Sequence, residues 1–248
     1  MNLIVLGSFA SLLAGLATGF GALLVFLVRK VSDRFIDASL GFAAGVMLAA
    51  SSFSLIVPAI EIGGIWKTAL GIVLGTVFLI FAERITPHIH RVSGVKGPST
   101  KLSRLWLFIL AITIHNFPEG MAVGVGFGEG NIKAGTVLAI GIGLQNVPEG
   151  LAVALPLLGE KKTRMKAFLI ALFTGLVEPI GGFLGISVVS MATFLLPYSL
   201  AFAAGAMLFV ISEEIIPETH SRGNDREATI GVITGFLVMT VLDNLFRR

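Results

Sequence analysis

The sequence predicts an all-α membrane protein with eight transmembrane helices, because of its composition, its long apolar segments and its internal repeats. Hydrophobic residues make up 55% of the chain and charged ones 13%, and the mean hydropathy is +0.93. A soluble domain of 248 residues cannot bury so much apolar surface. A helix crosses the hydrocarbon core with about 20 apolar residues. Such segments form a single transmembrane domain at 3–28, 37–60, 63–82, 105–127, 134–157, 167–190, 198–216 and 229–246.

Basic residues predict the orientation of these spans. The segment 3–28 is expected to be a retained helix and no signal peptide, since no basic region precedes its long apolar run. Loops after spans 1, 3, 5 and 7 hold 14 of the 18 basic residues. By the positive-inside rule, both termini are expected to lie on the non-cytoplasmic side. The membrane is expected to be a cell (inner) membrane. The excess of basic over acidic residues therefore reflects the topology of the spans and does not indicate nucleic-acid binding. The lipid bilayer is the expected partner.

A long-range repeat relates the second span to the seventh. Residues 39–56 match residues 199–216 at ten of eighteen positions. Five spans apart, the two segments run in opposite directions through the membrane, as in the inverted repeats of secondary transporters. We therefore expect a 3+2+3 arrangement with spans 1–3 and 6–8 as an inverted repeat around spans 4 and 5. The alternative is that Ala and Gly recur there only because they allow close helix packing.

A second repeat, with a period of 30 residues, carries most of the polar groups inside the spans. Residues 115–123 (HNFPEGMAV) align with residues 145–153 (QNVPEGLAV). Both segments lie about halfway through a span, and Glu178 lies near the middle of span 6. A carboxylate at that depth costs at least about 2.5 to 3.5 kcal/mol on insertion scales. Glu119, Glu149 and Glu178 are therefore expected to face a cation.

Helical spacing gathers these side chains into one site. His115 lies four residues before Glu119, and Gln145 lies four before Glu149. Asn116 and Asn146 each lie three before the same glutamates, so each helix directs three polar side chains into one sector. Pro118, Pro148 and the Glu178-Pro179 pair are expected to bend or break their helices at this depth.

The ligand types favour a borderline divalent metal ion. Imidazole, carboxylate and amide groups suit zinc, iron(II), manganese or cadmium, and the absence of cysteine argues against copper(I). Three carboxylates with a neutral His115 sum to −3, so the site can hold one divalent ion tightly and a second more weakly. No prosthetic group is expected, and the metal ion is expected to be a transported substrate.

These motifs resemble the signature of the ZIP (Zrt/Irt-like protein) family of metal transporters. The resemblance covers the whole chain, and the short loops are similar to those of the compact bacterial members. It implies uptake of zinc or related ions toward the cytoplasm. It also implies one ion at His115, Glu119, Gln145 and Glu149, and a neighbouring ion at Asn116, Glu119, Asn146, Glu149 and Glu178. Some relatives place a carboxylate where this chain has Asn146, so the second ion would be held less strongly here.

Further acidic and histidine side chains gather at the expected cytoplasmic ends of the spans. They are predicted as exit-side ligands on the pathway, with ordinary solvated residues as the alternative, and a homodimer is left open as the assembly. The exit-side residues are Glu83, His88, His90, Glu213, Glu214 and Glu218.

Two other functions remain open at this stage. An intramembrane metalloenzyme could use a His- and Glu-bound zinc to activate water, although the sequence has no His-Glu-x-x-His motif. An ion-coupled carrier of a small organic solute would be expected to place a basic residue against an anionic substrate, yet basic residues occur only at the ends of the spans. Because the features of both are missing, we predict a transporter and not an enzyme. Measurement of metal-dependent flux without any turnover of peptide or lipid would separate the three functions.

Overall fold

In the part of the chain that the structure describes, eight helices are long and apolar enough to cross a membrane, which confirms the predicted fold class. The computed structural model describes residues 2–28, 31–90, 94–96, 100 and 102–247. Each span begins or ends within a few residues of its expected position, and the second span is the longest at 31 residues. The spans are Leu3–Leu27, Asp33–Gly63, Ile65–Ile85, Leu105–Gly126, Ile132–Gly159, Arg164–Met191, Thr193–Thr219 and Asp225–Phe246.

Several spans consist of more than one helical element. The second and the seventh each contain a π-helical stretch, a feature that often occurs near functional sites. The helical elements are α1 (Leu3–Ala22), α2 (Leu24–Leu27), α3 (Asp33–Ala49), η1 (Ala50–Ile56), α4 (Val57–Gly63), α5 (Ile65–Ile85), α6 (Arg104–Gly126), η2 (Gly128–Gly130), α7 (Ile132–Gly159), α8 (Arg164–Gly175), α9 (Glu178–Met191), η3 (Thr193–Leu195), α10 (Leu196–Val210), η4 (Ile211–Ile215), α11 (Ile216–Thr219) and α12 (Asp225–Arg247).

A short β-hairpin follows α5. Its strands are β1 (His88–His90) and β2 (Gly94–Lys96), which pair antiparallel with His88 opposite Lys96. This segment lies outside the spans and has no apolar periodicity that would favour a helix. Its backbone N–H and C=O groups therefore pair with each other across the two strands. The hairpin is the one departure from helical structure among the elements of the described chain.

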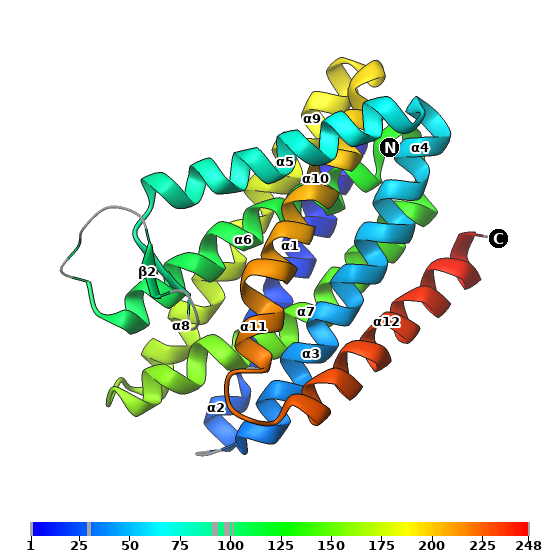
Figure 1. The fold of residues 1–248 in the computed structure, drawn as a ribbon. Helices are drawn as coiled ribbons and strands as arrows, with labels where there is room; N and C mark the ends of the chain where they lie inside the picture. Colours follow the sequence, from blue (N-terminus) through cyan, green and yellow to red (C-terminus); the bar gives the residue numbers. More distant parts are fainter. Residues whose placement is uncertain (1, 29–30, 91–93, 97–99, 101, 248) are drawn as a thin grey trace.

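The helices assemble into two groups. The central group comprises α1, α2, α6, α7, α8 and α9, and α1 contacts α6, α7, α8 and α9. The flanking group comprises α3, η1, α4, α5, α10, η4, α11 and α12. In it α12 lies along α3 and α10 lies along α5 (Figure 1). The two groups meet where α3 and α12 contact α7 and where α10 contacts α6.

Glycines bring helix backbones into contact within each group. A Cβ atom on Gly75 would lie 2.0 Å from the carbonyl oxygen of Phe202, and one on Gly235 would lie 2.0 Å from that of Phe42. Gly75 and Phe42 each precede their counterparts Gly235 and Phe202 by 160 positions, the same offset that relates residues 39–56 to 199–216. The contact of α5 with α10 and that of α12 with α3 are therefore built in the same way.

The same offset recurs in the central group. Gly15 on α1 and Gly175 on α8 are 160 positions apart and approach each other, each virtual Cβ lying 2.3 Å from the other's carbonyl oxygen. A Cβ on Gly120 would lie 2.0 Å from the oxygen of Glu178, and one on Gly150 would lie 1.8 Å from that of Thr18. Any residue larger than glycine at these positions would push the helices apart. The close contacts therefore fix the relative positions of α1, α6, α7 and α9.

Candidate metal centre

Three helices of the central group carry a cluster of buried polar side chains. α6 and α7 run as continuous helices past Pro118 and Pro148, and the sixth span is interrupted between α8 and α9 directly before Glu178. None of the seven side chains is more than 7% exposed. The cluster consists of His115, Asn116 and Glu119 on α6, Gln145, Asn146 and Glu149 on α7, and Glu178 at the first position of α9.

Hydrogen bonds connect the start of α9 to its neighbours. The Asn146 amide donates to the Glu178 Oε1 atom at 2.6 Å and to the carbonyl oxygen of Ala14 at 2.8 Å. The Ser11 hydroxyl donates to the carbonyl oxygen of Glu178 at 2.8 Å. These bonds fix one carboxylate oxygen of Glu178 relative to α7 and α1, and a negative charge at the first turn of a helix is favoured by the helix dipole.

Most of the remaining polar atoms of this cluster have no hydrogen-bond partner among the described residues. They include both carboxylate oxygens of Glu119, both polar atoms of the Asn116 and Gln145 side chains, and one oxygen each of Glu149 and Glu178. Glu119 is close enough to Glu149 and Glu178 for their charges to interact. Buried carboxylates and amides are normally paired. This arrangement is therefore suited to binding a cation between α6, α7 and α9.

His115 also belongs to a second group of ligands, which lies between the two helix groups. Its Nε2 atom is 3.0 Å from Oε1 of Glu214 on η4. Ligand atoms of Glu83, His115 and Glu214 lie within 4.8 Å of one another. Glu83 lies in the last turn of α5 and Glu214 lies on η4, both in the flanking group, whereas His115 lies on α6. An imidazole and two carboxylates at this separation can hold a divalent ion.

The other residues predicted at the exit side have different surroundings. Glu218 on α11 accepts a hydrogen bond from Arg222 at 2.5 Å. Glu213 lies on η4 beside Glu214. The backbone of His88 and His90 forms strand β1, but their side chains lie outside the described part of the chain. The structure therefore brings Glu83 and Glu214 to His115 and does not bring Glu218 to the same cluster.

Two buried acidic residues were not singled out from the sequence. Asp243 on α12 is 8% exposed and accepts a hydrogen bond of 2.7 Å from Ser54 on η1. Asp37 on α3 is fully buried and is bonded by Arg222 and Asn224. The signal that could have found them is an acidic residue inside or at the start of an apolar span, which is costly in lipid unless it has a partner.

Comparison with known proteins matches residues 95–243 to a family described as ZIP Zinc transporter. The zinc transporter GufA of Myxococcus xanthus is 44% identical, over 96% of this chain and 97% of that protein. The zinc transporter ZIPB of Bordetella bronchiseptica is 44% identical over 92% of this chain and 77% of its own length, and human zinc transporter ZIP11 is 36% identical over 91% and 93%. The chain therefore belongs to the ZIP family, whose members are transporters and not enzymes.

Proposed function

We propose that this protein transports zinc across the membrane, with iron(II), manganese and cadmium as further ions of the same class. Its relatives are named as zinc transporters, and its family is one of transporters. The observation that carries the proposal is the buried cluster on α6, α7 and α9, in which most carboxylate and amide atoms, apart from the Asn146 amide and the Glu178 oxygen that it bonds, have no hydrogen-bond partner among the described residues. Carboxylate, imidazole and amide ligands without thiolate hold zinc less tightly than a structural zinc site does. Weaker binding is what transport needs, because the ion must leave the site again.

The ion binds at the central cluster. One ion is held by His115, Glu119, Gln145 and Glu149. A second, weaker ion position adjoins it and uses Asn116, Asn146 and Glu178 together with the same two glutamates. The bond between Asn146 and Glu178 supports the weaker binding at this second position, because an ion there competes with an existing hydrogen bond.

The ion then leaves toward the cytoplasm past the cluster of Glu83, His115 and Glu214. All the central ligands belong to the central group, while Glu83 and Glu214 belong to the flanking group. Alternating access follows when one group moves against the other while the ion stays bound to Glu119 and Glu149. The distribution of basic residues supports an orientation in which both termini lie outside the cytoplasm, in a cell (inner) membrane.

The experiment is uptake of radioactive zinc into liposomes that carry the purified protein. The native chain is compared with His115→Ala and Glu119→Ala, and with Glu160→Gln as the control. Glu160 is an exposed carboxylate just after α7. Saturable uptake that is lost in the first two variants and kept in the control supports the proposal. Absence of zinc, iron, manganese and cadmium uptake by well-folded native protein would rule it out.

A further inference from the structure

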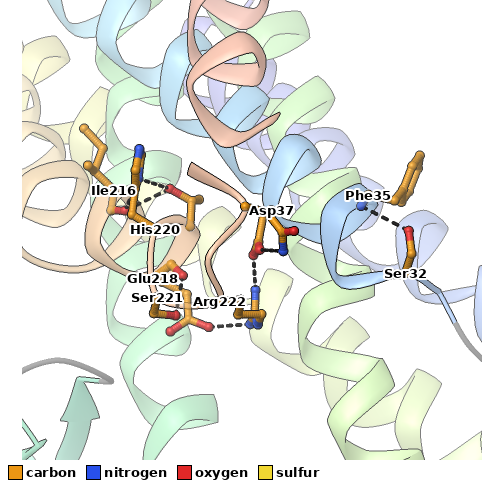
Figure 2. A network of polar contacts seen from close by, with 10 residues as sticks. Ser32, Phe35, Asp37, Ile216, Glu218, His220, Ser221 and Arg222 are labelled. Atoms are coloured by element: carbon orange, nitrogen blue, oxygen red, sulfur yellow. Dashed lines mark hydrogen bonds and ion pairs between the residues drawn. The ribbon is translucent and has the colours of Figure 1, made fainter. Parts of the chain in front are cut away.

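A buried carboxylate joins the start of the second span to the loop after the seventh (Figure 2). Asp37 on α3 is fully buried, and its carboxylate accepts from the guanidinium of Arg222 and from the Asn224 amide, the latter at 2.8 Å. Between these two donors lies Gly223, whose φ of 77° allows the turn that brings both side chains to one carboxylate. The loop is therefore fastened to α3 by a charged contact.

Arg222 holds a second carboxylate at the same time. Its Nη2 atom donates to Oε1 of Glu218 on α11 at 2.5 Å, as Figure 2 shows. The Arg222 side chain is 20% exposed, so this contact is partly shielded from water. A planar guanidinium presents several donors in a fixed geometry and can engage two carboxylates at once. One positive charge is thus shared between Asp37 and Glu218.

The other half of the repeat closes the equivalent junction without charges. With the offset of 160 positions, the counterpart of Asp37 is Pro197 and that of Gly223 is Gly63. A Cβ on Gly63 would lie 2.5 Å from the Cβ atom of Pro197, so the equivalent junction is closed by apolar contact. A buried ion pair seldom stabilises a fold more than apolar residues of similar shape do. The presence of the charged contact between Asp37 and Arg222 at only one of the two equivalent junctions therefore calls for a functional explanation.

The neighbouring residues suggest that reason. Glu214, which contacts His115 at 3.0 Å, lies four residues before Glu218, and Arg222 lies four residues after it. Glu218 lies about one helical turn after Glu214, so an ion that leaves the cluster of Glu83, His115 and Glu214 along η4 and α11 toward the loop would pass the Glu218 carboxylate. A further strong ligand at that place would retain the ion and slow its release.

We propose that Arg222 is a positioning residue at the exit: anchored by Asp37, it holds the Glu218 carboxylate so that this group does not bind the departing metal ion. Arg222 acts as a tethered cation that occupies Glu218 in place of zinc. The inference rests on the proposed transport of divalent ions.

The test is zinc uptake into liposomes by Arg222→Gln, Glu218→Gln and the double variant Arg222→Gln/Glu218→Gln, with Arg226→Gln as the control. Arg226 is an exposed basic residue on the first turn of α12. We expect Arg222→Gln to lower the maximal uptake rate about fivefold or more, a usual size for coupling between neighbouring sites, and to lower KM as well. Glu218→Gln alone and the double variant are each expected to keep at least half of the native rate.

A double variant as slow as Arg222→Gln would overturn the proposal, because the loss would then arise from the contact with Asp37 alone. Glu218→Gln as slow as Arg222→Gln would overturn it too, since Glu218 would then take part in transport. Should Arg222→Gln fail to fold, Asp37→Asn/Arg222→Gln removes the buried charge together with its partner, and the same rescue by Glu218→Gln is expected. Native protein without zinc uptake would refute the proposed function, whereas native uptake without this rescue refutes the present inference only.

Discussion

Replacement of Gly150 by alanine should disturb both the packing and the transport of this protein. Gly150 follows Glu149 on α7, and a Cβ atom there would lie 1.8 Å from the carbonyl oxygen of Thr18 on α1. Ordinary contact begins at 3.4 Å, so α1 and α7 would have to separate by about 1.6 Å. Overpacking of this kind costs about 1 to 3 kcal/mol. A misplacement of about 1 Å at a reacting or binding site can lower activity about a hundredfold.

The same helix offers a matched control. Gly159 is the last residue of α7, and a Cβ there would have no atom within 4 Å. Alanine at that place should be neutral or stabilising by up to about 1 kcal/mol through helix propensity. For a chain of this length each kcal/mol moves the unfolding temperature by about 2 to 4 °C.

Two assays separate the variants. Thermal unfolding in detergent should show a lower midpoint for Gly150→Ala than for Gly159→Ala, and zinc uptake into liposomes should fall at least about tenfold for Gly150→Ala only. Equal midpoints and equal uptake would refute the reasoning, because α1 and α7 would then not approach at Gly150 as closely as the structure places them.

Three further outcomes are expected. Glu119→Gln and Glu149→Gln should each raise the Kd for zinc at least about tenfold, about 1.4 kcal/mol, by isothermal titration; native affinity in both would remove these carboxylates from the site. Zinc uptake should decrease as the pH is lowered from 8 toward about 5, because metal ligands bind only in their deprotonated forms and protons therefore compete with zinc for the buried cluster, and a flat profile would count against this cluster. Asp37→Asn should destabilise the fold by about 1.5 to 3 kcal/mol in thermal unfolding, since Arg222 keeps Glu218 but Arg222 and Asn224 lose the charged acceptor that both bond, whereas an unchanged midpoint would show that this pair has no structural role.

Local features of the sequence indicate a large part of the architecture. The apolar segments predict eight spans, and the spacing of His115, Glu119, Gln145 and Glu149 places their side chains on facing sides of two helices. The break before Glu178 was expected because Pro179 follows it, and proline favours the start of a helix over its interior. These inferences need only residues within one or two turns of each other.

Contacts between distant segments could not be predicted in the same way. Glu214 and His115 are nearly a hundred positions apart, and their contact depends on how the flanking group packs against the central group. Arg222 and Asp37 are 185 positions apart, and the local contact of Arg222 with Glu218 does not indicate the distant one with Asp37. The π-helices η1 and η4 likewise depend on tertiary packing, since no residue type in them requires an extra backbone position in the turn.

The ion site at the centre of this account can be located directly by anomalous diffraction from crystals of the protein grown with zinc, recorded on both sides of the zinc absorption edge. The account predicts a zinc peak bounded by carboxylate oxygens of Glu119 and Glu149, between α6 and α7, and its loss in the Glu119→Gln/Glu149→Gln variant. Zinc found only at surface histidines, in protein that takes up zinc in liposomes, would contradict it.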